Sequence, residues 1–206
     1  NARLGSGDWL VAEADESDGS FLRLNPLIAV VTNIDADHLE NYGGDFARVQ
    51  AAFSEFLHRL PFYGLAVLCI DDAEVAALAV DMPRHVVTYG FAAHADVRAE
   101  DVEQAGPAMR FTLCLPDGSR TPTTLALPGR HNVQNALAAA TIGWELGVAP
   151  ETIARALEKF AGIGRRFNLL AELTTAQGAK VQLVDDYGHH PKELEAVFQA
   201  ARGGWP

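Results

Sequence analysis

The first ninety residues alternate between short, wholly apolar runs and longer amphipathic stretches. The apolar runs are typical of strands buried on both faces of a parallel sheet, and they are Trp9–Ala12, Leu27–Val31, Leu65–Ile70 and Val86–Tyr89. Apolar residues also recur at helical spacing over 45–60, where Pro61 ends the segment. Asp71 and Asp72 can cap a second helix towards Val80, because aspartate accepts the free amide hydrogens of a first turn. The alternation predicts an α/β fold with a mostly parallel sheet flanked by helices.

The pattern changes over residues 96–127, where short segments of alternating character surround a strong turn signal. We expect a small antiparallel sheet there, set against the parallel one. An alanine-rich helix should follow over 133–146, with Asn132 as its N-cap and Gly147 as its stop. Another helix is expected over 150–160.

A glycine-rich stretch, Gly162-Ile163-Gly164, then resembles a hinge. Beyond it, a β–β–α pattern runs from Asn168 to Arg202. The chain opens on Asn1 rather than on a methionine and stops just after this last helical pattern, so we expect it to be a piece of a longer protein.

Composition excludes several functional classes. Lysine and arginine total 16 against 27 aspartates and glutamates, a net charge of −11, which disfavours nucleic-acid binding and a basic membrane-surface helix. The longest apolar runs hold five or six residues, whereas a membrane helix needs about 18. No basic-then-apolar leader is visible, and we expect a soluble protein. Cys69 and Cys114 are best explained as buried strand thiols in a reducing compartment, with a disulfide as the alternative.

Two clusters of residues whose side chains can bind a metal follow predicted strands. Open α/β sheets bind their ligands at the carboxyl ends of such strands. The first holds four carboxylates that repel one another and favour a cation or wide solvation, namely Glu13, Asp15, Glu16 and Asp18. The second is the segment TNIDADH over 32–38, whose oxygen donors and one imidazole suit Mg²⁺ or Mn²⁺ better than structural zinc. A solvated acidic loop and an ordinary turn histidine are the alternatives.

Three later segments carry groups that suit phosphates or a base. His131 and Asn135 share one face of a predicted helix start, where free amides favour an anion and the side chains can read a base. Arg165 and Arg166 follow the flexible turn and suit phosphate or pyrophosphate. The segment DDYGHHP over 185–191 joins an acidic pair to paired histidines between a strand and a helix. Capping residues and a surface basic pair are the alternative readings of the first two.

Taken together, five blocks resemble the Mur ligases of peptidoglycan synthesis. They are EADESDGSF (13–21), TNIDADHLENY (32–42), PGRHNVQNAL (128–137), GIGRRF (162–167) and VDDYGHHP (184–191). The blocks fall in the family's order and span nearly the whole chain. Within the family they favour the branch that joins L-alanine to UDP-N-acetylmuramate over the branch that recycles murein tripeptide, which stays as the alternative.

The resemblance implies a division into two parts. Residues 1–163 correspond to most of the central ATP-binding domain, a P-loop-type domain, and residues 164–206 to the start of a Rossmann-like C-terminal domain. No G-x-x-x-x-G-K-[ST] string occurs in the chain, so this domain lacks its P-loop here. Because that loop supplies the main grip on the ATP phosphates, we expect these 206 residues alone to be inactive.

The resemblance also implies roles for single residues. The metal ligands are Glu13 and His38, and the residues around the nucleotide are His131, Asn132, Asn135 and Asn33. The residues matched to catalysis are Arg165, Arg166, Asp186 and His189. Those that would face the substrate are Arg165, Arg166, Tyr187 and His189.

The implied reaction transfers the γ-phosphate of ATP to the muramyl carboxylate, after which the amino group of L-alanine displaces phosphate and forms an amide. Such a transfer depends on positioning and on charge neutralisation by cations, here Mg²⁺ or Mn²⁺. The expected partners are UDP-N-acetylmuramate, L-alanine and ATP in a bacterial cytoplasm, with neither nucleic acid nor membrane. A metal-dependent phosphohydrolase built on the DADH and DDYGHH clusters is one alternative, and a binding-only module is another.

Overall fold

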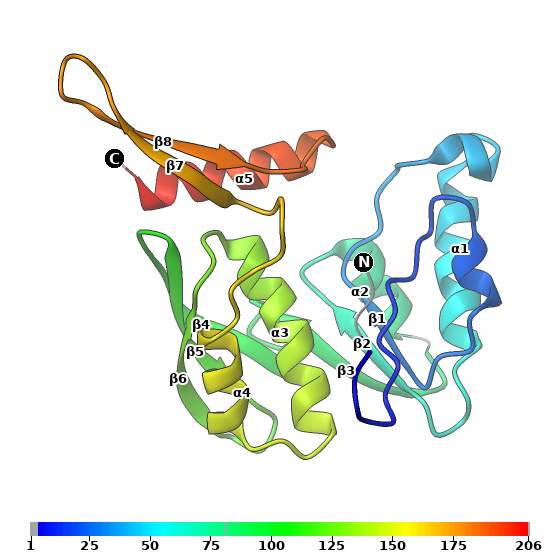
Figure 1. The fold of residues 1–206 in the computed structure, drawn as a ribbon. Helices are drawn as coiled ribbons and strands as arrows, with labels where there is room; N and C mark the ends of the chain where they lie inside the picture. The colour runs from blue at the N-terminus through cyan, green and yellow to red at the C-terminus, as the bar shows by residue number, and fades with distance from the viewer. Residues whose placement is uncertain (1–3, 81, 206) are drawn as a thin grey trace.

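The protein folds as a six-stranded sheet with helices on both faces and a separate two-stranded sheet (Figure 1), in a computed structural model that describes residues 4–80 and 82–205. The strands of the larger sheet lie in chain order and are β1 (Ile28–Val31), β2 (Leu65–Cys69), β3 (His85–Gly90), β4 (Val97–Ala105), β5 (Ala108–Cys114) and β6 (Arg120–Leu125). The smaller sheet pairs β7 (Asn168–Thr174) with β8 (Lys180–Asp185). The helices are η1 (Ser20–Arg23), η2 (Leu39–Tyr42), α1 (Phe46–His58), α2 (Ala73–Val80), α3 (Arg130–Glu145), α4 (Pro150–Glu158) and α5 (Pro191–Gly204).

The parallel part of the sheet is buried on both faces, as its apolar runs predict. All five residues of β2 are buried, and its pairings with β1 and β3 are parallel. Leu65, Val67 and Cys69 belong to the core cluster that includes α3 and α4. The intervening Ala66 and Leu68 belong to the cluster that includes α1. Because neighbouring strand residues point to opposite faces, both helical layers pack on this one strand.

The expected antiparallel strands are confirmed, and they continue the parallel sheet. β4 pairs with β5 and β5 with β6, both antiparallel, while the start of β4 pairs with the end of β3 in parallel. Asp96 holds that junction, because its carboxylate accepts hydrogen bonds from the Thr88 amide at 2.8 Å and the Thr88 hydroxyl at 2.6 Å. The result is one mixed sheet rather than a second sheet set against the first.

The strand expected at Trp9–Ala12 is wrong. The structure assigns no strand there, and Leu10 and Val11 are 90% and 93% exposed. A strand exists only where a neighbouring strand supplies hydrogen bonds, and none of the described strands pairs with this run. Apolar composition indicates a preference for burial but not the presence of a partner.

The helix boundaries follow their caps. The Asp45 side chain accepts from the Ala47 amide at the start of α1, and Asp72 accepts from the amides of Glu74 and Val75 at the start of α2. Asn132 is not the N-cap of α3, because the helix already begins at Arg130 after Gly129. The Asn132 amide group instead donates to the Pro128 carbonyl at 2.8 Å.

The second half of the C-terminal helix α5 packs against the part of the protein that contains the six-stranded sheet. Figure 1 shows it lying above the β4–β5 turn and the start of α3. Ala200 is 1% exposed, and the Gln104 amide donates to the Ala200 carbonyl at 2.7 Å and to the Gly106 carbonyl at 3.2 Å. A β-carbon on Gly204 would lie 2.6 Å from the Gly106 carbonyl oxygen, so glycine is required for this close approach.

Cys69 and Cys114 are both free and buried, as expected, and burial raises the pKa of the Cys69 thiol. Among the residues that the structure describes, no helix combines the length and the apolar character needed to cross a membrane.

Candidate nucleotide and metal site

Asp71 links the ends of two parallel strands to helix α3. Its carboxylate accepts hydrogen bonds from the amides of Phe91 and Ala92, at 2.8–3.1 Å, and from the Gln134 side chain at 2.7 Å. A β-carbon on Gly90 would lie 2.6 Å from this carboxylate, so glycine lets the two elements approach. The sequence interpretation treated Asp71 only as a helix cap. The signal was present, because one of two adjacent aspartates suffices as a cap and the other is free for a tertiary contact.

The two predicted metal loops lie side by side. The Asn41 side chain donates to the Ser17 carbonyl at 2.7 Å, and the Tyr42 hydroxyl donates to the Glu16 carbonyl. These bonds tie the acidic loop 13–18 to η2, which begins directly after His38. The pKa of Asp15 is lowered, mainly because Ser17 donates hydrogen bonds to it, with a smaller contribution from His38. Tertiary structure thus joins two motifs that are about twenty residues apart in the sequence.

The donor chemistry of these loops fits a hard divalent cation, but a complete cluster is not assembled. The Glu13 side chain is exposed, and the His38 ring lies 3.7 Å from the Asp37 carboxylate and 3.9 Å from that of Glu40. In the described part of the chain, no three His, Cys, Asp or Glu side chains are grouped to hold a metal ion. The assignment of Glu13 and His38 as ligands therefore stays a prediction.

The start of α3 brings His131 against the C-terminal segment. Burial lowers the pKa of His131, and Asp186 and Arg166 also influence it in opposite directions, which places both near the imidazole. Asn135, one turn further along, is exposed, and Asn33 is exposed with its side chain donating to the Thr32 hydroxyl at 3.1 Å. The Arg130 guanidinium lies over the Phe91 ring at 4.1 Å, so the first turn of α3 also touches the end of β3.

The arginine motif and the Asp-Tyr-His motif form one structural unit. The register of the β7–β8 hairpin pairs Asn168 with Asp185, so the residues just outside it meet. Asp186 accepts hydrogen bonds from the Phe167 amide at 2.8 Å and the Gly188 amide at 2.7 Å. The Tyr187 amide donates to the Arg165 carbonyl at 2.8 Å, and the Arg165 guanidinium lies 4.6 Å from the centre of the Tyr187 ring.

Glu193 fixes the other side of this unit. Its carboxylate accepts from the amides of His189 and His190 at 3.0 and 3.2 Å, and it pairs with the Arg166 guanidinium at 3.3 Å. The His189 ring packs edge-on against Tyr187, with 5.3 Å between the ring centres. Sequence reasoning missed Glu193, although a glutamate at the third position of a helix is the signature of a capping box.

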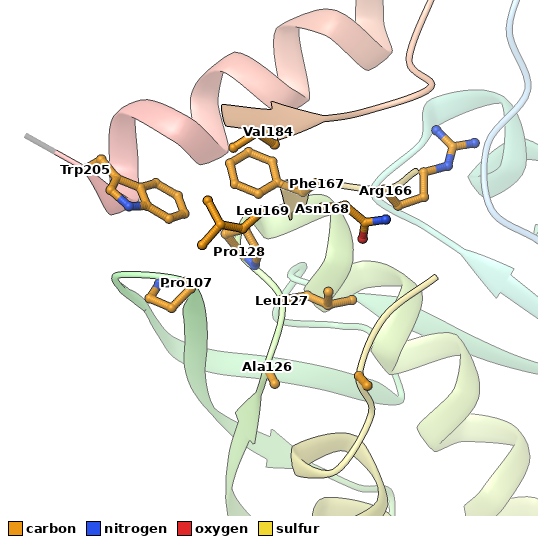
Figure 2. A pocket seen from close by; sticks show the side chains of 11 residues that line it. Pro107, Ala126, Leu127, Pro128, Arg166, Phe167, Asn168, Leu169, Val184 and Trp205 are labelled. Atoms are coloured by element: carbon orange, nitrogen blue, oxygen red, sulfur yellow. The ribbon is translucent and has the colours of Figure 1, made fainter. Parts of the chain in front are cut away.

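A pocket of about 180 Å³ marks the junction between the two sheets (Figure 2). Phe167 and Trp205 stack at its edge, with 5.3 Å between ring centres and 22° between planes. Leu127 and Pro128 of the β6–α3 connection lie opposite. Arg166 also borders it, but its guanidinium points away from the stacked rings. Most of the residues that line the pocket are apolar, and Phe167 connects it to Asp186 through its backbone amide.

Comparison with known proteins identifies relatives of this chain. The chain is 80% identical over all 206 residues to the UDP-N-acetylmuramate–L-alanine ligase of Xanthomonas campestris pv. campestris and 79% identical to that of Xanthomonas oryzae pv. oryzae, and it spans 43% of each. Among solved structures, it resembles UDP-N-acetylmuramate-alanine ligase MurC of Thermotoga maritima, with a TM-score of 0.76, 28% identity, and coverage of 93% of this chain and 41% of that one. It also resembles MurF of Acinetobacter baumannii, with a TM-score of 0.76, 26% identity, and coverage of 91% and 40%.

The sequence pattern of the Mur ligase middle domain matches residues 7–143, which is more than half of the chain. This match includes the acidic loop, η2, all six strands of the larger sheet and most of α3. The chain therefore belongs to the Mur ligase family.

Proposed function

We propose that this chain serves an ATP-dependent ligase that joins L-alanine to the carboxylate of UDP-N-acetylmuramate in the synthesis of peptidoglycan precursors. The observation that carries the proposal is the 80% identity over the whole chain to ligases of that name. Because the chain spans 43% of their length, the proposal concerns a protein of the length of those relatives. We assign residues 1–163 to its central domain and residues 164–206 to the start of its C-terminal domain.

The start of α3 would bind the nucleotide. Burial lowers the pKa of His131 and so favours its neutral form, which offers one donor and one acceptor nitrogen and suits the edge of a base. Asn135 adds an amide donor and acceptor one turn along the same helix face. Asn132 would act on this site through the backbone, because its side chain holds the Pro128 carbonyl. Asn33 would approach from the loop after β1.

The unit around Asp186 would act on the phosphates and the substrate. Arg165 and Arg166 carry the positive charge that offsets the charge transferred between ATP and the muramyl carboxylate. Asp186 accepts two backbone amides and so fixes the loop from which Tyr187 and His189 face the substrate. The Arg166–Glu193 pair is half-exposed, and a phosphate can replace Glu193 as the partner of that guanidinium.

Magnesium would be held by Glu13 and His38, whose loops are tied together through Asn41 and Tyr42. When bound, the ion supplies positive charge next to the ATP phosphates. The expected setting is the bacterial cytoplasm, with small-molecule partners.

The test is phosphate release by the full-length enzyme with and without UDP-N-acetylmuramate and L-alanine. We expect release to require both substrates. We expect Glu13→Ala and His38→Ala each to raise the Mg²⁺ requirement by about tenfold or more. Glu172→Ala is the matched control, because this exposed glutamate pairs with Lys180 within the β7–β8 hairpin.

Two results would overturn the proposal. Phosphate-ester cleavage without an amino acid would show a phosphohydrolase, and a requirement for a peptide instead of L-alanine would show a recycling ligase. Near-normal activity of Glu13→Ala and His38→Ala at limiting Mg²⁺ would overturn the metal assignment alone.

A further inference from the structure

Lys192 occupies a position that helix electrostatics disfavour. It lies in the first turn of α5, where unpaired amide hydrogens create a partial positive charge that favours acidic side chains and opposes basic ones. Its neighbour Glu193 obeys this rule and accepts the amides of His189 and His190. The local sequence gives no reason for a lysine here, so its stabilising partner must lie elsewhere in the fold.

That partner is the loop after β1. The Lys192 ammonium lies 2.8 Å from one carboxylate oxygen of Asp35, whose other oxygen accepts the Ala36 amide at 2.9 Å. The pKa of Asp35 is lowered mainly by this contact with Lys192, and the pKa of Lys192 is raised mainly by the same contact, with a small further contribution from the charge of Asp72. The first turn of α5 is therefore joined to the loop that follows β1.

The ion pair joins two motifs that must lie close together for the proposed function. Asp35 lies three residues before His38, and Lys192 lies three residues after His189. The second half of α5 is anchored separately, because the Gln104 side chain in β4 donates a hydrogen bond to the Ala200 carbonyl. Because the second half of α5 is already held, the Lys192–Asp35 pair fixes the position of the first turn of α5. The loop from Asp186 to His189 leads directly into this turn, so its position is fixed as well.

We propose that Lys192 is a positioning residue of the ligase: paired with Asp35, it holds the loop that carries Asp186 and His189 against the loop that carries His38. The inference rests on the proposed roles of those motifs. Lys192 contacts neither substrate nor metal in this scheme. It acts by favouring the arrangement in which the two motifs face each other.

The expected effect is modest and has a distinctive signature. The Lys192 side chain is 70% exposed and that of Asp35 is 30% exposed, and exposed ion pairs are weak and screened by salt. Loss of the pair should raise KM for ATP and UDP-N-acetylmuramate by up to about fivefold at low salt. Because saturating substrates restore the closed arrangement, kcat should stay unchanged. The difference from wild type should vanish at about 1 M salt, where the screening length is about 3 Å.

The experiment compares Lys192→Ala, Lys192→Arg, Asp35→Asn and the Lys192→Ala/Asp35→Asn double variant in the full-length enzyme. Lys180→Ala is the matched control, because Lys180 is 74% exposed and pairs with Glu172 at 3.0 Å away from the site. We expect Lys192→Arg to behave as wild type. The double variant should show the same KM as Lys192→Ala, because the second change removes a partner that is already lost.

A second measurement does not depend on ligase activity. Hydrogen exchange of the Gly188 and His189 amides in the 206-residue chain should speed up in Lys192→Ala at low salt and not in Lys180→Ala. If exchange responds but the wild-type enzyme does not ligate L-alanine, the pair is real and the proposed function fails. If the enzyme ligates but Lys192→Ala matches Lys180→Ala in KM and exchange, the positioning role is overturned.

Discussion

The six-stranded sheet and the β7–β8 hairpin both contain apolar strand residues but bury them very differently. Every residue of β2 is buried, whereas no residue of β7 or β8 is buried and Leu170 is 61% exposed. β2 has a strand on each side and helices on both faces, but each hairpin strand has one partner. The leucines and valines of the hairpin stay exposed because fewer layers cover them, and the polar residues between them agree with that exposure.

This difference bears on the proposed function because the hairpin carries the Asp186 motif. The larger sheet supports the strand-end loops, while the hairpin and α5 lie outside its core and meet it at a junction that includes the Gln104–Ala200 and Lys192–Asp35 contacts. Elements that must close over a ligand are drawn from the less stable parts of a fold. The predictions below test this contrast.

Truncation in the core should have the largest effect. Leu68 is fully buried in β2, and Leu68→Ala should lower the free energy of unfolding by about 3 kcal/mol because it leaves a cavity. Leu183→Ala, at a position 51% exposed in β8, should change it by less than about 0.5 kcal/mol. Urea unfolding followed by circular dichroism measures both. Equal losses would show that the hairpin shares the main core.

Substitution of a glycine between β6 and α3, where α5 packs, should have the second largest effect on stability. Gly129 has φ of 94°, and a β-carbon there would lie 2.7 Å from the His131 ring and 2.9 Å from the Ala200 side chain. Gly129→Ala should cost about 2–3 kcal/mol, which combines backbone strain with displacement of α5. Gly178→Ala is the control: φ is 83° but nothing lies within 4 Å, so it should cost about 1 kcal/mol. Equal costs in urea unfolding would argue against packing at Gly129.

The Gln104 contact should have a smaller effect. Gln104→Ala removes the donor to the Ala200 carbonyl and should cost about 1 kcal/mol, seen as faster hydrogen exchange along α5. Gln199→Ala removes an exposed contact to Glu195 within α5 and should leave that exchange unchanged. Unaltered exchange in Gln104→Ala would mean that α5 is held by other contacts.

The smallest expected effect on stability is electrostatic and occurs only at acidic pH. Arg120 and Arg98 lower the pKa of Glu100 from 4.5 to about 2. A carboxyl with a lowered folded-state pKa contributes stability that is present above its ordinary pKa, and this contribution is lost as the pH falls from about 4.5 to about 2. Glu100→Gln should therefore flatten the pH dependence of unfolding in that range, while Glu103→Gln should not. An unchanged slope in Glu100→Gln would contradict this assignment.

Local patterns predicted most elements because their causes are local. The apolar run Leu65–Ile70 and the helical spacing over 45–60 correspond to β2 and α1, since residue periodicity already states which faces are apolar. The prediction at Trp9–Ala12 failed because a strand needs a partner. The N-cap of α3 was misplaced because Gly129, at a positive φ, starts the helix before Asn132.

The candidate site was also predicted only in its local features. Its chemical groups could be chosen from the sequence, since carboxylates, imidazoles and paired arginines are recognisable as residue types in short blocks. Their assembly could not, because contacts such as Asp71 to Gln134 and Asp35 to Lys192 join residues that the chain separates widely. Whether Glu13 and His38 bind a metal stays a prediction.

The sequence by itself determined the α/β class, the order of most of the elements, the residue types suited to phosphate, and the family resemblance. Tertiary structure decided that β4 to β6 extend the parallel sheet, that the two acidic loops meet, and that Lys192 faces Asp35. The physical reason is the separation along the chain over which each interaction acts. Periodicity and capping act over a few residues, whereas strand pairing and ion pairs depend on which distant segments the fold brings within a few ångströms.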